Sequence, residues 1–296
     1  MAGCTAFTGH DRAPLPTCPP CGGAVSARSA RNRQHRISRT AVLTAALLTA
    51  VTACSSTKTS GKGGDEVQLV SSGKLTTCTH LPYEPFQFKQ GKKIVGFDVE
   101  LVDLVAKDLD VEQKIVDTPF EGIQSGEDLN ASKCDLAAAG MTITPVREKN
   151  LDFSAPYFEA TQALLTKKGK KYDSLDDLKG KELGVQQSTT GEEYAKKHGK
   201  GITTRQYEDL GLLLTAVKTG QVDAGINDNG VLYDYAKKNP DTQVTAEFDT
   251  GEQYGIGVRT GNDALRKQIN KTIKKAKADG RYDKIYKKWF GTEPKK

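Results

Sequence analysis

Short apolar runs and amphipathic stretches alternate along the chain from Val67 onwards. The segment 74–79 predicts a strand, and in the segment 97–109 apolar residues recur near every 3.6 positions, as in an amphipathic helix. The run 134–140 is almost continuously apolar, which is typical of a strand buried on both faces. Similar patterns predict strands at 183–185 and 222–226 and helices at 192–197, 210–218 and 230–238.

This alternation of strands and helices predicts an α/β protein built on parallel sheets. Two such sets are present, one before about residue 160 and one between about 165 and 250. The segment 262–290 is predicted to be a helical tail with an apolar stripe that includes Ile269 and Trp289. The length of 296 residues is sufficient for two domains with buried cores.

The N-terminal segment has the pattern of an export signal. Basic residues at 28–39 precede an apolar stretch, 41–50, that is too short to span a membrane. The next residues, 51–54 (VTAC), resemble a bacterial lipobox, so we expect removal of 1–53 and acylation of Cys54. Residues 54–65 would then be a lipidated, flexible tether. The alternative is a plain signal peptide with an incidental cysteine.

The formal net charge of +6 does not indicate nucleic-acid binding, because it is concentrated in the export segment. Residues 1–53 contain six arginines and one acidic residue, whereas 54–296 is nearly balanced in charge. A CxxC at 18–21 has no second pair beside it and would be lost on export. We interpret residues 1–27 as non-functional, with the start codon assigned too early.

Sequence motifs of common enzymes are missing. The chain has no GxxxxGK[ST], GxSxG or HExxH motif, and only two histidines, His80 and His198, follow residue 54. We therefore expect no catalytic residue, no cofactor and no metal site.

Several motifs occur in order through nearly the whole exported chain: LPYEPF at 81–86, VGFDV at 95–99, AGMTITPVR at 139–147, DFSAPY at 152–157 and KKWFG at 287–291. Together they resemble the polar amino-acid substrate-binding proteins of bacterial ABC importers, extracellular solute-binding protein family 3, of the glutamine/glutamate type. The resemblance implies a two-lobed, periplasmic-binding-protein-like α/β fold (type II) with two hinge strands. Lobe 1 would comprise 66–161 plus 254–296 and lobe 2 would comprise 162–253, with the ligand in the cleft.

A free amino acid carries a carboxylate and an ammonium, and a selective site must satisfy both. Arg147 matches the family's carboxylate-binding arginine, with Thr142 on the same loop, and a guanidinium fork suits a carboxylate. Thr189 and Thr190 would add a second carboxylate contact at a helix N-terminus, although they could simply cap that helix. They follow Ser188, where the family often has glycine.

The remaining candidates concern the ammonium and the ligand side chain. Asp228 matches the family's ammonium partner, with the carbonyl of Gly140 beside it; the alternative is that Asp228 only caps the following helix. Tyr83 and Phe120 match the family's aromatic positions that enclose the aliphatic part of the ligand. His80 and Gln186 match two positions that contact the ligand side chain. The family's glutamine binders have aspartate and lysine at these two positions, so this chain departs from that pattern. Near these positions, Glu121 and Asp228 are the only acids that we identify.

Cys78 and Cys134 are the cysteines left in the folded part, in an oxidising compartment. A disulfide between them is one alternative. The other is that two free thiols lie too far apart, because Cys78 is late in its strand and Cys134 begins a neighbouring one.

The expected function is capture of a polar amino acid, glutamine or glutamate by resemblance, outside the cell and delivery to the permease subunits of an ABC transporter. The protein would be anchored by lipid to the outer face of the cell membrane. We expect it to be a monomer and to have no nucleic-acid partner. Two alternatives use the same fold: a cyclohexadienyl-dehydratase-like enzyme with Glu121 as the acid, and a ligand sensor.

Overall fold

The computed structural model describes residues 66–294, all within one compact unit. The predicted signal peptide, the lipobox with Cys54 and the tether lie outside the described residues. No helix of 66–294 is long and apolar enough to cross a membrane.

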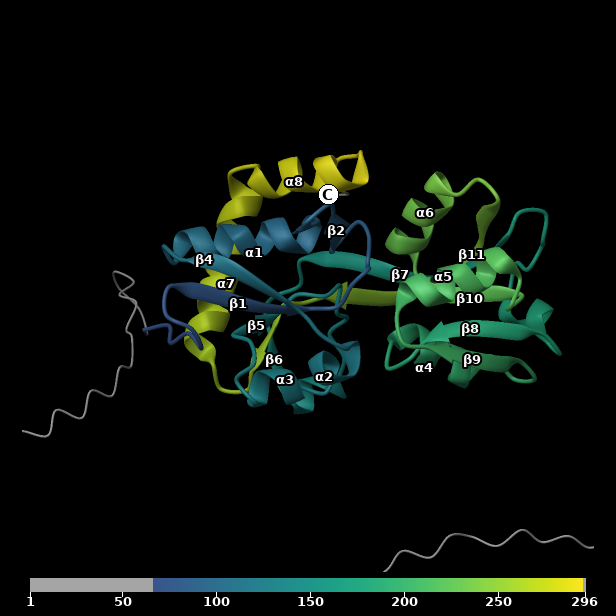
Figure 1. The fold of residues 1–296 in the computed structure, drawn as a ribbon, viewed down its shortest axis with the longest axis horizontal. Helices are drawn as coiled ribbons and strands as arrows, with labels where there is room; N and C mark the ends of the chain where they lie inside the picture. Colours follow the sequence, from purple (N-terminus) through teal and green to yellow (C-terminus); the bar gives the residue numbers. More distant parts are fainter. Residues whose placement is uncertain (1–65, 295–296) are drawn as a thin grey trace, which may run out of the picture. The chain divides into compact units, whose positions relative to one another are not determined.

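Two five-stranded sheets form the centres of two lobes (Figure 1). In the first sheet β1 pairs in parallel with β4 and β5, and β12 pairs antiparallel with β5 and β6. In sheet order these strands are β4 (Glu112–Asp117), β1 (Lys74–Thr79), β5 (Leu136–Ala137), β12 (Gly257–Arg259) and β6 (Leu151–Phe153).

In the second sheet β8 pairs in parallel with β10 and β9, whereas β7 pairs antiparallel with both β10 and β11. In sheet order its strands are β11 (Thr242–Tyr254), β7 (Phe158–Lys167), β10 (Ala224–Asp228), β8 (Glu182–Gln186) and β9 (Thr203–Tyr207). The predicted parallel pairing is thus present in both sheets, but each sheet also contains antiparallel pairs, so both are mixed. The chain enters this lobe along β7 and returns along β11, so these two long strands run in opposite directions beside each other (Figure 1).

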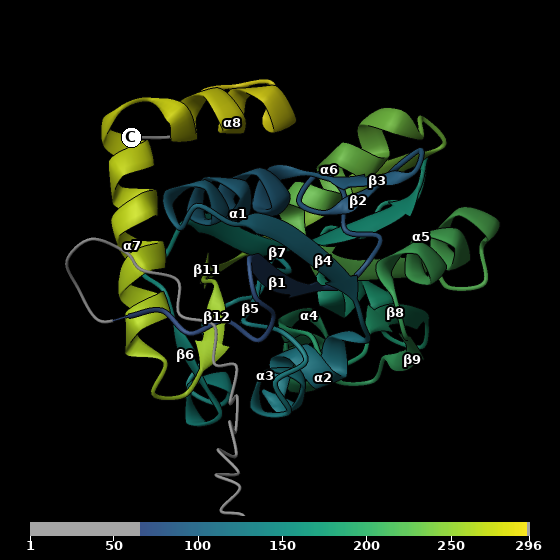
Figure 2. The ribbon, with the colours of Figure 1, turned by 60° about the vertical axis from the view of Figure 1, so that its left-hand side comes forward.

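Helices cover both sheets. Figure 2 shows α7 and α8 beside α1, which they contact. The remaining helices are short or belong to the second lobe. The bounds are α1 Phe97–Asp108, α2 Phe120–Gln124, α3 Glu127–Asn130, η1 Arg147–Lys149, η2 Leu175–Leu178, α4 Thr190–His198, α5 Leu210–Thr219, α6 Asn229–Lys238, α7 Asp263–Ala278 and α8 Arg281–Phe290, with a hairpin of β2 (Phe88–Gln90) and β3 (Lys93–Val95).

The predicted strand at 74–79 and the helices at 97–109, 192–197, 210–218 and 230–238 are present within a few residues. Two predictions needed correction. The predicted tail helix is interrupted at Gly280, whose positive φ of 78° ends the first helix. The apolar run 134–140 contributes only two residues, Leu136 and Ala137, to a strand.

The start of α1 holds the loop that carries Tyr83. The N–H groups of Phe97 and Asp98 donate to the carbonyls of Pro85 and Phe86 at 3.0 Å. Gly96 permits this approach: its φ is 143°, and a Cβ there would lie 2.0 Å from the carbonyl oxygen of Phe86. The VGFDV motif thus fixes the position of the LPYEPF loop.

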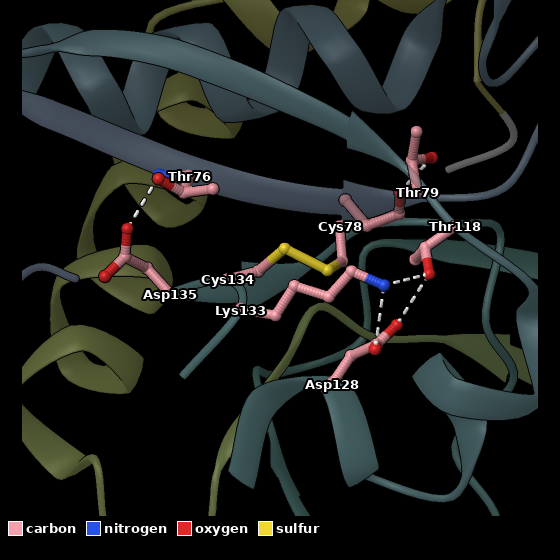
Figure 3. The surroundings of a disulfide bond; sticks show 9 residues. Thr76, Cys78, Thr79, Thr118, Asp128, Lys133, Cys134 and Asp135 are labelled. Carbon is pink, nitrogen blue, oxygen red and sulfur yellow. Dashed lines mark hydrogen bonds and ion pairs between the residues drawn. A yellow bond between two sulfur atoms is a disulfide. The ribbon is translucent and has the colours of Figure 1, made fainter. Parts of the chain in front are cut away.

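Cys78 and Cys134 are joined by a disulfide, with their Cα atoms 5.6 Å apart (Figure 3). The residue after Cys134, Asp135, is bonded to β1 in two ways. Its N–H donates to the Thr76 carbonyl at 2.8 Å, and its carboxylate accepts the Thr76 N–H at 2.7 Å. Cys134 therefore lies directly beside β1, within the distance that a disulfide requires.

We expect the double variant Cys78→Ala/Cys134→Ala to lose roughly 2–4 kcal/mol of unfolding free energy, because the bridge closes a long loop of the unfolded chain. The two cysteines are separated by 56 positions. Denaturant unfolding of the two proteins at equal pH measures the difference. An unchanged midpoint and slope would contradict the expectation.

Candidate functional site

All ten residues predicted to bind ligand line one cavity. They come from the ends of β1 and β10, from the start of α2, and from the loops that follow β5 and β8. Two further lining residues, Gln87 and Ala139, were missed. The complete lining is His80, Tyr83, Gln87, Phe120, Ala139, Gly140, Thr142, Arg147, Gln186, Thr189, Thr190 and Asp228.

Arg147 lies on η1 and is 5% exposed. Its guanidinium carbon is 5.2 Å from the centre of the Phe120 ring. It donates from Nη1 to the Thr142 carbonyl at 2.8 Å and from Nη2 to the Ser188 carbonyl, in the other lobe, at 3.2 Å. Burial lowers the pKa of Arg147, but a guanidinium remains charged in proteins. With five N–H donors and two in these bonds, it retains donors for an anionic ligand.

Thr189 is the N-cap of α4: its hydroxyl oxygen accepts the Glu192 N–H at 3.2 Å. The capping role considered from sequence is therefore real, and it leaves the other N-terminal N–H groups of the helix for a ligand. Ser188 has a φ of 65°, in the left-handed region that glycine adopts at lower cost. This conformation explains why glycine suits the position.

Asp228 is the last residue of β10 and is 5% exposed. Its carboxylate accepts hydrogen bonds from the hydroxyls of Tyr83, at 2.6 Å, and Tyr254, and from the amide of Gln162. It makes no side-chain cap to α6, so the alternative that it serves only as a helix cap is wrong. Burial, with the negative charge of Glu252 as a second cause, raises the pKa of Asp228 to about 6.

Gly140 has a φ of 57°, and a Cβ there would lie 2.7 Å from the Tyr83 ring. Its N–H donates to the carboxylate of Asp98 at 2.8 Å, and the Tyr157 hydroxyl donates to the other oxygen at 2.8 Å. Burial raises the pKa of Asp98 to about 7. Asp98 supports the cavity wall from behind, a role that its place in the VGFDV motif did not reveal.

Glu252 is an acid beside the site that sequence reasoning missed. It lies on β11, is 8% exposed, and accepts from the hydroxyls of Thr142 at 2.7 Å and Thr190 at 2.8 Å. It also accepts from the Gln162 amide at 2.9 Å. The expectation that Glu121 and Asp228 are the only nearby acids is therefore wrong. Glu121 does not line the cavity and bonds the Ser188 hydroxyl.

The chain matches, over residues 75–292, the model of the bacterial extracellular solute-binding proteins, family 3. It belongs to this family. The glutamine-binding protein GlnH of the ABC transporter of Bacillus subtilis (strain 168) is 38% identical over 210 residues, which are 68% of this chain and 75% of that protein.

Two solved structures of the family's fold are also similar. An ancestral arginine-binding protein bound to arginine is 44% identical, with a TM-score of 0.71 over 74% of this chain and 99% of that one. The ancestral amino acid-binding protein AncCDT-1, a precursor of cyclohexadienyl dehydratase, is 37% identical, with a TM-score of 0.70 over 74% and 96%. The two-lobed type II fold is thus that of an amino-acid-binding protein, as the sequence motifs indicated.

Proposed function

We propose that the protein captures a polar amino acid outside the cytoplasm and delivers it to the permease of an ABC importer. The observation that carries this proposal is the pairing of one buried cation, Arg147, with one buried carboxylate, Asp228, in the lining of a single small cavity. Opposite charges in this arrangement match the two charges that every free α-amino acid carries.

In this proposal Arg147 holds the ligand carboxylate, with the backbone N–H groups of Thr142 and of the α4 N-terminus at Thr189 and Thr190 supplying further donors. Asp228 and the carbonyl of Gly140 hold the ammonium. Burial and the negative charge of Asp228 raise the pKa of Tyr83, so its hydroxyl stays protonated and orients that carboxylate. The rings of Tyr83 and Phe120 enclose the aliphatic part of the ligand.

Ligand binding would favour the closed arrangement of the lobes. Bonds already join the lobes directly: Arg147 to Ser188, Tyr83 to Asp228 and Lys238 to Glu84. A ligand between Arg147 and Asp228 bonds both lobes only when they are closed, so it shifts the equilibrium towards that state. We take β7 and β11 as the hinge strands, with lobe 1 at 66–161 plus 254–296 and lobe 2 at 162–253.

We further propose that residues 1–53 are removed on export and that acylated Cys54 anchors a monomer to the outer face of the cell membrane. The lipobox pattern at 51–54 supports this. Membership of an extracellular family supports a location outside the cytoplasm.

The dehydratase alternative has one observation in its favour, the similarity to a precursor of such an enzyme. That precursor is itself an amino acid-binding protein by description. Glu121, the acid proposed for catalysis, lies outside the cavity lining, so we propose a binding protein without enzymatic activity.

Calorimetry of the purified protein with each of the twenty amino acids tests the function. We expect saturable, one-to-one binding of one amino acid or a few related ones, and no product from a prephenate-like acid. Product formation would support the enzyme, and no binding of any amino acid would overturn the proposal.

A further inference from the structure

The hydrogen-bond pattern at the cavity wall identifies the kind of side chain that the ligand carries. His80 directly follows β1, and its Nδ1 lies 2.9 Å from the carbonyl oxygen of Thr118. A carbonyl oxygen only accepts, so Nδ1 carries a proton, and in the neutral form of the ring Nε2 then presents a lone pair. Nε2 is buried and has no hydrogen-bond partner within residues 66–294. In its neutral form His80, which lines the cavity, therefore has an unused acceptor.

Gln87 offers a second acceptor. Its amide nitrogen donates to the carbonyl of His80 at 3.4 Å, which assigns the two ends of the side chain. The amide oxygen, Oε1, is buried without a partner in the described part of the chain. Gln87 and His80 both line the cavity, and each has one buried acceptor atom without a partner in the described part of the chain.

Gln186, on the opposite lobe, offers a donor. The backbone N–H of Asp228, which can only donate, bonds the side-chain oxygen of Asn227 at 2.8 Å. The other end of that amide, Nδ2, donates to Gln186 Oε1 at 3.2 Å. The oxygen of Gln186 is thereby occupied, and its NH₂ group remains for a ligand acceptor.

We propose that this cavity selects an amino acid whose side chain ends in a carboxamide. The ligand NH₂ donates to His80 Nε2 and Gln87 Oε1, and the ligand C=O accepts from the Gln186 NH₂. The inference rests on the proposed amino-acid-binding function. It also gives the ligand side chain a bond to each lobe, in addition to the bonds at Arg147 and Asp228.

Competing side chains match this pattern less well. A carboxylate places acceptor oxygens against the acceptors of His80 and Gln87, with no proton between them. A guanidinium or ammonium can donate to those two atoms but has no acceptor for Gln186. Each mismatch leaves a buried polar group unpaired, which is a strong basis for discrimination.

The test compares ligands on the wild-type protein by calorimetry at pH 8, where histidine side chains ordinarily carry no charge. The probes are L-glutamine, L-asparagine, L-glutamate, L-glutamate γ-methyl ester and L-arginine. The ester keeps the C=O of glutamine and lacks its N–H donors. We expect one of the two carboxamides to bind most tightly, and the ester at least about tenfold more weakly than glutamine if glutamine is that ligand.

Equal affinity for glutamine and its ester, or tightest binding of glutamate or arginine, would overturn the carboxamide inference and leave the binding function intact. Failure of every amino acid to bind would overturn both. These ligand comparisons need no variant and so do not depend on how a substitution folds.

Substitutions then locate the contacts. His80→Phe and Gln186→Met should each reduce the preference for carboxamide over ester or carboxylate at least about threefold. His198→Phe is the matched control, since His198 stacks on Tyr194 on α4 and does not line the cavity. An unchanged preference in a folded His80→Phe protein would contradict the inference.

Discussion

The Arg147→Ala variant should bind its amino acid at least about 100-fold more weakly than the wild-type protein. In the proposed site the substitution leaves the ligand carboxylate buried without its charged partner, and breaking a buried ion pair in this way costs about 3–5 kcal/mol. Calorimetric titration of the two proteins at the same pH measures the ratio. The Arg147→Lys variant, which keeps the charge and loses the fork, should lie between them.

Arg205→Ala is a suitable control for general effects of removing an arginine. Arg205 is exposed, pairs with Glu182 at 2.7 Å and does not line the cavity, so this variant should keep wild-type affinity. The unfolding temperature of Arg147→Ala without ligand shows whether the fold is retained. Wild-type affinity in a folded Arg147→Ala protein would refute the site assignment.

Much of the fold could be predicted because local patterns specify local structure. The strand at 74–79 and the helices of both lobes have apolar periodicities that survive in the structure. The antiparallel pairing of β7 with β11 could not be predicted in this way. It depends on where the chain crosses between lobes, about 80 residues apart in sequence, and periodicity contains no information on such pairing.

The candidate site, like the fold, could be predicted only in part from the sequence. Residues in ordered motifs, such as Tyr83, Gly140 and Arg147, could be placed together because a family resemblance provides their three-dimensional neighbours. Glu252 could not, since three of its partners come from elements distant in sequence and nothing in its own stretch of sequence indicates burial. The same holds for the donor and acceptor directions at His80 and Gln186, which follow from bonds to Thr118 and Asn227.

Ligand affinity should fall by about tenfold between pH 7 and pH 5, because protonation of Asp228 would compete with the ligand ammonium that we propose it binds. The pKa of Asp228 is raised to about 6 in the unliganded protein, so the carboxylate is mostly ionised at pH 7 and mostly protonated at pH 5. Calorimetry across this range gives the profile. The Asp228→Asn variant should bind far more weakly and with a shallower profile, whereas the exposed Asp241→Asn should follow the wild type.

The stability of the unliganded protein, unlike its ligand affinity, should increase as the pH falls. A carboxyl whose pKa is raised by folding destabilises the fold when ionised, so this penalty is present above the folded pKa and is relieved as the pH falls below it. For Asp228 and Asp98, with pKa values of about 6 and about 7, the relief occurs between about pH 7 and pH 4. Thermal unfolding with and without saturating ligand should therefore show a ligand-induced increase in Tm that shrinks on acidification. A ligand-induced increase that stays constant from pH 7 to pH 5 would show that the ammonium is held by a group other than Asp228.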